Sequence, residues 1–195
     1  MAELIAIGAL VILALVLVAS SVRVIQQSYV GIVQRVGRYQ RTIGPGVHLL
    51  VPMLDRVATV VDMKETVQAF APQPVITQDN VTIGIDTVVY YQVTDAVKAN
   101  YEVANVLQAM EQLTITTLRN VVGAMTLEET LTSRDSINSQ LRSVLDEATE
   151  KWGVRVTRVE LKSIDPPRTI QEAMEQQMRA DRAKRAAVLS AEGEK

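Results

Sequence analysis

The sequence predicts an α+β protein that has an N-terminal transmembrane helix, two small α/β subdomains with antiparallel-rich sheets, and a long C-terminal helix or coiled coil. Three observations predict this class. An uncharged apolar run opens the chain, short β-branched segments separated by Gly and Pro follow it, and a stretch rich in Glu, Gln, Arg and Ala comes last. We expect an anchor over 1–22, a β-rich first subdomain over 23–72, an α/β second subdomain over 73–166, and the start of the C-terminal helix over 167–195.

The anchor is predicted over Leu4 to Val22, a run of nineteen residues without a charged side chain. A helix of that length rises ~28 Å, which matches the ~30 Å hydrocarbon core of a bilayer. The alternatives are a cleaved signal peptide, a buried soluble helix and a re-entrant hairpin. A signal peptide needs a basic leading region, whereas Glu3 is the only charged side chain before the run. The residues expected to contact lipid are Leu4, Ile5, Leu10, Ile12, Leu15, Leu17 and Val22.

The flanks of the run predict the orientation in the membrane. Arg23, Arg35, Arg38 and Arg41 follow it, and no basic side chain precedes it. Short cytoplasmic segments carry the excess of Lys and Arg. We therefore expect a single-pass protein of the cell membrane, with the N-terminus outside and the large domain in the cytoplasm.

Residues 24–61 are predicted to form a small antiparallel sheet. Short apolar runs at 30–33, 47–51 and 57–61 are separated by Gly and Pro, a pattern typical of strands joined by tight turns. Residues 42–46 contain two glycines flanking Pro45, which predicts a turn there. The prolines of Ala71-Pro72-Gln73-Pro74 disfavour both a helix and a central strand, so we place the subdomain boundary there.

The second subdomain opens on a strand and continues with two helices. Alternation over 81–93 places Ile83, Ile85, Thr87 and Val89 on one face of that strand. Helical spacing then predicts a first apolar stripe of Val103, Val106, Leu107, Met110, Thr114, Thr117, Leu118 and Val121. A second helix is expected to begin near Ser133 and to bury Ile137, Leu141, Val144, Leu145 and Ala148.

The last strand is predicted over 154–164, after a left-handed helix cap at Gly153. Val154 and Val156 lie at even positions, whereas Val159 and Leu161 lie at odd ones. One extra residue restores the alternation, so we expect a β-bulge at Thr157-Arg158.

The C-terminal segment, from Arg168 to Lys195, is predicted to be one helix after Pro166-Pro167. Small residues recur in it with heptad spacing, which indicates a seam for self-association. A solvated single helix is the alternative, because the stripe covers only about three heptads and is poor in Leu and Ile. The predicted seam comprises Ala173, Gln176, Ala180, Ala183, Ala187 and Ser190.

The composition leaves few residues for catalysis, so we expect no enzyme, no cofactor and no metal site. Cysteine is absent and His48 is the one histidine, in an apolar strand where a structural role is expected. The sequence shows neither a phosphate-binding glycine loop nor a nucleophile elbow. The adjacent Glu128 and Glu129 do not face each other on a helix, so we place them on a solvated surface. With seven aromatic residues and a net charge of −2, nucleic-acid binding is not expected.

Three arginines of the first subdomain have a predicted role at the membrane. Arg38, Arg41 and Arg56 lie in the segment that follows the anchor. We expect them to contact anionic lipid headgroups, a contact worth ~1 kcal/mol for each residue near the surface. The alternative is that they are ordinary surface arginines.

Motifs along nearly the whole chain resemble a known family. They are Val36-Gly37-Arg38-Tyr39, Gly44-Pro45-Gly46, Val51-Pro52, Asp55-Arg56, Thr77-Gln78-Asp79-Asn80, Ser133-Arg134-Asp135-Ser136-Ile137-Asn138, Trp152-Gly153-Val154 and Asp165-Pro166-Pro167. In this order they resemble the SPFH family, also called Band 7 or prohibitin-homology proteins, and in particular its stomatin-like, bacterial slipin-type members.

The resemblance implies a membrane-anchored scaffold whose copies form ring- or cage-like complexes that organise membrane microdomains and client membrane proteins. It implies the chain itself and the lipid bilayer as partners, together with a membrane protease or an NfeD-like membrane protein. No nucleic acid and no small-molecule substrate are expected. The alternative is a regulatory adaptor of a membrane protease, AAA-type or NfeD-associated, or of a channel. Two departures are the lack of cysteine, which excludes the lipid anchoring of some relatives, and an early stop in a helix that is longer in the family.

Overall fold

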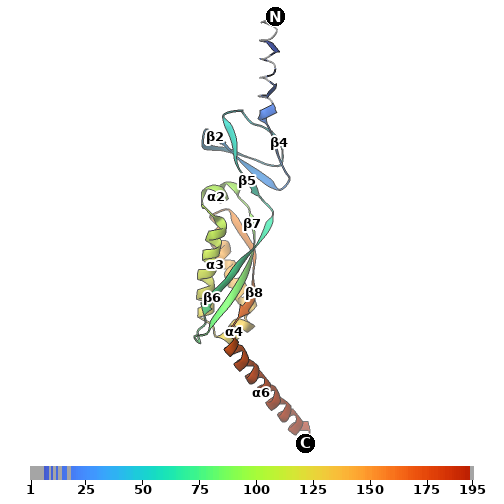
Figure 1. Cartoon of the computed structure of the whole chain (residues 1–195), viewed down its shortest axis with the longest axis vertical. Helices are drawn as coiled ribbons and strands as arrows, with labels where there is room; N and C mark the ends of the chain where they lie inside the picture. The colour runs from blue at the N-terminus through green and yellow to red at the C-terminus, as the bar shows by residue number, and fades with distance from the viewer. Residues whose placement is uncertain (1–6, 9, 11, 13–14, 17–18, 194–195) are drawn as a thin grey trace. The chain divides into compact units, whose positions relative to one another are not determined.

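The computed structural model describes residues 7–8, 10, 12, 15–16 and 19–193. Its elements follow the predicted order of strands, then helices, then one long strand and a long helix (Figure 1). They are β1 (Val22–Ile25), β2 (Tyr29–Arg35), β3 (Arg38–Ile43), β4 (Gly46–Leu49), β5 (Asp55–Asp62), β6 (Glu65–Ile76), β7 (Thr82–Val93), α2 (Ala96–Tyr101), α3 (Val106–Gly123), α4 (Leu127–Thr132), α5 (Arg134–Glu150), β8 (Val154–Asp165) and α6 (Arg168–Gly193).

The chain forms two compact units, and both draw on several parts of the sequence. The first unit comprises Met1–Gln68, Val89–Gln112 and Arg142–Arg158, and the second comprises Ala69–Val88, Leu113–Leu141 and Val159–Lys195. Elements such as β7 and α5 therefore contribute residues to both units. The boundary that we predicted at 72/73 falls within β6.

The first unit contains a three-stranded sheet in the order β3-β2-β5 and a two-stranded ribbon of β1 and β4, both antiparallel. Its core consists of Ile25, Val33, Ile43 and Leu50. Gly31 makes this packing possible, because a Cβ atom there would lie 2.9 Å from Ile43 and 3.1 Å from Ile25. The small antiparallel sheet predicted for residues 24–61 is confirmed.

A charge pair joins β2 to β5 at the end of the first sheet. Arg35 lies directly opposite Asp55, and its Nε and Nη2 donate to the two carboxylate oxygens of Asp55 at 2.7 and 3.1 Å. The Val51 N–H donates to the same carboxylate at 3.0 Å, and the Asp55 N–H returns a bond to the Val51 carbonyl. The Asp55 side chain is 1% exposed. These bonds fix residues 51–55, which connect the ribbon to the sheet.

The second sheet has the order β6-β7-β8. As predicted, Ile83, Ile85, Thr87 and Val89 are buried on one face of β7. Pro72 and Pro74 lie in β6, which is an edge strand of this sheet. A proline is tolerated at an edge because its missing N–H removes no bond from the interior of the sheet.

The two long helices begin near the predicted positions, but their buried faces differ in part. Met110 and Leu118 of α3 and Ile137, Leu141 and Leu145 of α5 are buried as expected. The prediction is wrong for Leu107 and Val144, which are 39% and 42% exposed, while Val122 and Thr149 are buried instead. Helical spacing fixes a stripe only to within one position, and tertiary packing selects the residues at its margin.

Two short helices, α2 and α4, were not predicted. Asp95 caps α2 by accepting bonds from the N–H groups of Val97 and Lys98. Thr126 and Glu129 form a capping box at the start of α4. Glu128 and Glu129 are both exposed, as expected, but the capping role of Glu129 was not predicted. The spacing of a threonine three residues before a glutamate was the signal for that role.

The burial pattern of β8 changes phase at Thr157-Arg158, as predicted. Val154 and Val156 are buried before these two exposed residues, and Val159 and Leu161 are buried after them. A second change, at Lys162-Ser163, was not predicted. Side chains of α5 complete the bonding of this strand, because Asp146 accepts from the Val156 N–H and Asn138 accepts from the Leu161 N–H.

The predicted anchor lies only partly within the described residues. Leu10, Ile12 and Leu15 are helical and 63–68% exposed, whereas Leu4, Ile5 and Leu17 lie outside the described residues. Val22, the last residue of the predicted anchor, begins β1 and pairs with Leu49, and its contact with lipid stays a prediction. A search of the described positions identifies no helix with both the length and the apolarity needed to cross a bilayer.

We predict that Gly153→Ala destabilises the protein by at least about 2 kcal/mol. Gly153 has a φ of +65°, and a Cβ atom there would lie 2.6 Å from the Asp95 carbonyl oxygen. Gly44 is the matched control, because its surroundings are open to 4 Å. We expect Gly44→Ala to change the free energy of unfolding by less than about 0.5 kcal/mol. Urea unfolding of the two variants checks the prediction, and equal midpoints would contradict it.

We predict that Asp55 makes the protein sensitive to acid. Hydrogen bonds from Arg35 and from the Val51 N–H lower the pKa of Asp55 from 3.8 to about 2. The folded protein therefore binds this proton more weakly than the unfolded chain does. The contribution of Asp55 to the free energy of unfolding is present when the pH is above the unfolded pKa of 3.8, and it is lost as the pH falls toward the folded pKa of about 2. Asp55→Asn should unfold at a lower temperature near neutral pH, and the difference should shrink below about pH 4. Circular dichroism measures it, with Glu147→Gln as an exposed control; a difference independent of pH would contradict the assignment.

Candidate functional site

The outer face of the β1–β4 ribbon is apolar. Val22 lies opposite Leu49 and Val24 lies opposite Val47, so the four side chains share one face. Val24, Val47 and Leu49 are 68–69% exposed. The opposite face carries Ile25, which belongs to the core, together with the pair of Arg23 and His48. The apolar side chains of the outer face are therefore the ones that remain exposed.

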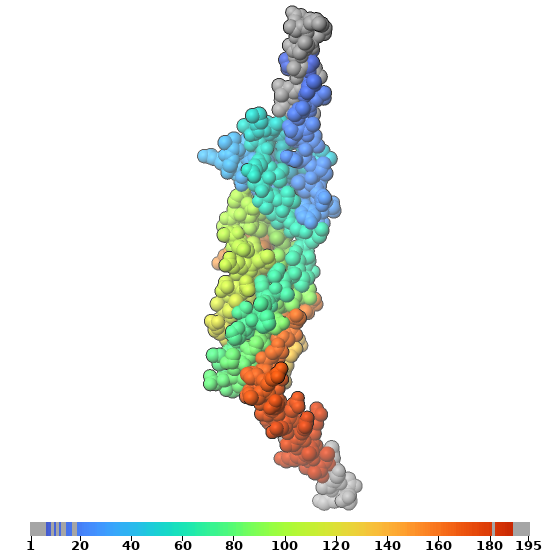
Figure 2. Space-filling view, viewed as in Figure 1, coloured from blue at the N-terminus to red at the C-terminus, as the bar shows by residue number. Residues whose placement is uncertain are grey.

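The turn between β2 and β3 presents a strained valine. The turn consists of Val36 and Gly37, which have φ values of 49° and 81°, as a two-residue turn of type I′ requires. A left-handed conformation is unfavourable for a β-branched residue. Val36 is nevertheless 79% exposed, and Figure 2 shows this light-blue turn projecting from the surface of the first unit. Backbone strain at an exposed apolar residue points to a functional role.

A second apolar turn lies beside the first. Met53 has a φ of 67° and is 97% exposed, and Leu54 is 48% exposed. The Val36 N–H donates to the Leu54 carbonyl oxygen at 3.2 Å, which holds the two turns together. The Leu50 N–H donates to the Ser21 carbonyl oxygen at 2.8 Å and so ties this segment to the last helical residue before β1. We call the exposed residues of the ribbon and of the two turns the apolar end: Val22, Val24, Val36, Val47, Leu49, Met53 and Leu54.

The three predicted headgroup arginines are all exposed strand residues of the first unit. Arg38 begins β3 directly after the Val36 turn, and Arg56 is the second residue of β5. Arg41 donates through Nη2 to the carbonyl oxygen of Leu49 at 3.0 Å, which places it beside the apolar end. Their contact with lipid stays a prediction.

Sequence reasoning missed the apolar end and used Arg23 only for topology. The alternation of Val22 with Val24 and of Val47 with Leu49 was the available signal. It identifies an apolar face of a strand but cannot say whether that face is buried.

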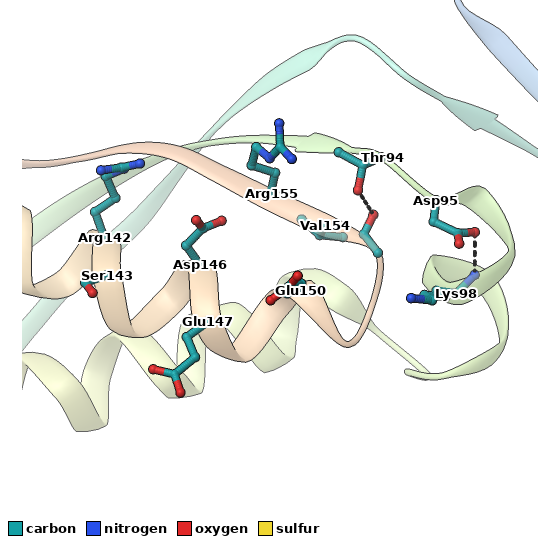
Figure 3. A pocket seen from close by; sticks show the side chains of 11 residues that line it. Thr94, Asp95, Lys98, Arg142, Ser143, Asp146, Glu147, Glu150, Val154 and Arg155 are labelled. Atoms are coloured by element: carbon teal, nitrogen blue, oxygen red, sulfur yellow. Dashed lines mark hydrogen bonds between the residues drawn. The ribbon is translucent and has the colours of Figure 1, made fainter.

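A polar cavity of about 510 Å³ lies elsewhere in the first unit, between α5, β8 and α2 (Figure 3). Figure 3 shows Asp146 pointing toward β8 and Glu147 pointing away from it. Asp146 accepts from the backbone of β8 and Asp95 caps α2. The Thr94 and Asp95 N–H groups and the Thr94 hydroxyl all donate to the carbonyl oxygen of Gly153. The polar groups of this cavity therefore hold the ends of the elements together.

His48 takes part in a local backbone contact. Its Nε2 donates to the carbonyl oxygen of Gly44 at 2.8 Å and so closes the turn before β4. This bond gives the imidazole the structural role that we expected for it.

The predicted seam residues lie along α6. Ala173, Gln176, Ala180, Ala183 and Ala187 are exposed, and Ser190 also lies in the helix. One ion pair on this surface joins Arg179 to Glu175 at 3.4 Å. The seam's role in self-association stays a prediction.

Comparison with known proteins supports the resemblance. Residues 23–195 match the family described as SPFH domain / Band 7 family. An uncharacterized protein of Mycobacterium tuberculosis is 59% identical over 192 residues, which are 98% of this chain and 50% of that protein. A stomatin homolog of Pyrococcus horikoshii is 38% identical over 181 residues, covering 93% of this chain and 68% of the homolog.

An uncharacterized protein of Methanocaldococcus jannaschii is 45% identical over 184 residues, which are 94% of this chain and 92% of that protein. The chain spans about half the length of the mycobacterial relatives. The family match covers the second unit and, from residue 23 onward, the first unit, and the motifs that suggested the resemblance lie within it. The chain therefore belongs to the SPFH domain / Band 7 family.

Proposed function

We propose that the chain is a subunit of a membrane-anchored scaffold, without enzymatic activity, whose apolar end rests against the bilayer. The apolar end carries this proposal. Seven apolar residues of the ribbon and of the two bonded turns are exposed, and two of them, Val36 and Met53, are held in left-handed turns. Exposed apolar patches mark interaction sites in folded proteins. Membership of a family that includes stomatin homologues supports a membrane as the partner.

The position of the apolar end in the chain favours lipid. The bond between Leu50 and Ser21 joins it to the end of the predicted anchor. An anchor over 1–22 would bring this surface to the level of the headgroups, where apolar turns enter the interface and arginines meet phosphate groups. Arg38 and Arg41 flank the apolar end and would supply those contacts. We place the protein in the cell membrane, as a single-pass protein whose large domain lies in the cytoplasm.

The scaffold function depends on self-association. Copies confined to a surface meet at a high effective concentration, so a weak lateral contact repeated many times gives a stable assembly. The exposed small-residue seam of α6 is the contact that we assign to this role. A ring- or cage-like assembly of such subunits would organise membrane microdomains and client membrane proteins.

We predict that Met53 lies within the lipid interface. The chain contains no cysteine, so Met53→Cys can be labelled at one position with an environment-sensitive fluorophore in the full-length protein. In phospholipid vesicles the label should be quenched by spin-labelled lipid and shielded from aqueous iodide. Glu147→Cys is the matched control, since Glu147 is an exposed residue of α5 outside the apolar end. Quenching of both labels by iodide alone would contradict a membrane role for the apolar end.

We predict that a charge in the seam weakens the assembly. Ala180→Glu places an anion within the seam of each copy, so we expect a smaller particle by light scattering in mild detergent. Met178→Glu adds the same charge at the heptad position on the far side of the helix from the seam, where the side chain is 50% exposed, and it should leave the particle size unchanged. A wild-type protein that is monomeric in these conditions would contradict the scaffold.

Crosslinking in native membranes distinguishes the scaffold from a regulatory adaptor. A scaffold gives a ladder of the chain itself, whereas an adaptor gives one heteromeric band.

A further inference from the structure

A cavity beside the apolar end has the composition of a lipid site. Its volume is about 640 Å³, and it lies between the end of the N-terminal helical residues, β1, the segment 50–53 and β5. Ile25, Leu50, Val57 and Val60 supply apolar lining. Ile25 and Leu50 also belong to the core, so this part of the lining is fixed by packing. The volume falls within the range of small-molecule sites, which combine apolar walls with a few charged groups.

The charged groups of the cavity differ in whether they have a partner. Arg23 lines it from β1 and Arg56 lines it from β5, and both residues are exposed. Neither guanidinium has a hydrogen-bond or ion-pair partner among the residues that the structure describes. The carboxylate of Asp55 also lines the cavity, but it is held by both the Nε and the Nη2 of Arg35. The lining therefore carries uncompensated positive charge next to apolar surface.

This combination defines the chemistry of the ligand. Two guanidinium groups bind a phosphate, and apolar walls accept a hydrocarbon chain. Ser20, which precedes the ribbon in the helical segment, is part of the same lining, so the cavity adjoins the predicted anchor. A neutral apolar ligand would leave the arginines without a partner, and a free phosphate would leave the apolar walls exposed.

We infer that this cavity binds one anionic glycerophospholipid, with its phosphate between Arg23 and Arg56 and an acyl chain against Val57 and Val60. The inference rests on the proposed membrane function and adds a lipid class to it. If each subunit binds one anionic lipid, an assembly of many subunits enriches this lipid in the bilayer beneath it.

Native mass spectrometry tests the inference. The chain is incubated with equal amounts of phosphatidylglycerol and phosphatidylcholine and is then released from detergent. We expect one bound phosphatidylglycerol per subunit. Each arginine near an anionic headgroup contributes a factor of about five to affinity, so Arg23→Gln should weaken binding about fivefold and the double variant with Arg56→Gln about 25-fold. Arg142→Gln is the matched control, because it removes an exposed arginine of the same unit, in α5, that lies neither in the cavity nor at the apolar end. Val60→Asp should also abolish retention, because it places a charge against the acyl chain.

Flotation on neutral phosphatidylcholine vesicles keeps the inference separate from the proposed function. Wild type and the double arginine variant should float equally, since the anchor and the apolar end are intact. Loss of flotation by the wild type would overturn the membrane function itself. Three outcomes would overturn the lipid site while leaving the membrane function standing. They are equal retention of the two lipids, equal losses in Arg142→Gln and Arg23→Gln, and displacement of phosphatidylglycerol by inorganic phosphate.

Discussion

The bidentate pair of Arg35 and Asp55 is the interaction on which the first unit depends. It closes β2 against β5 and, through the Val51 N–H, fixes the segment that leads from the ribbon to the sheet. That segment carries Met53 and Leu54 at the apolar end and lines the cavity next to it. Hydrogen bonds from Arg35 and from the Val51 N–H favour the ionised form of this carboxylate and lower its pKa. Both surfaces that we connect with the membrane therefore rely on one buried carboxylate and its partners.

Two of the exposed apolar residues of the first unit also have an unfavourable backbone conformation. Val36 occupies a left-handed position that asparagine or glycine fills more easily, and Met53 does the same in the neighbouring turn. A sequence selected for stability alone would replace both. The proposed contact with lipid would remove the contradiction, because apolar side chains at turn tips are favourable in the membrane interface and unfavourable in water. It would account for both the strain and the exposure.

Much of the fold was accessible from local patterns. Alternation identified the buried face of β7, including Ile83 and Ile85, and the change of phase in β8 appeared where Val156 and Val159 fall out of step. Gly153 was identified as a left-handed cap from its position after a helix. Each of these features depends on neighbours in the sequence. Val144 and Val122 were misjudged because their burial depends on which neighbour approaches the margin of a helix face.

The candidate site, like the fold, could be predicted from the sequence only in part. The sequence by itself determined the family, the order of elements, an apolar start and the presence of arginines near it, because composition, spacing and motifs are properties of the linear chain. Only the tertiary structure decided that Val24 and Leu49 share an exposed face, that the Val36 and Met53 turns are bonded neighbours, and that Arg23 and Arg56 line one cavity. Those facts follow from strand register and chain reversal, which bring together residues that are 17 to 33 positions apart and that no local pattern connects.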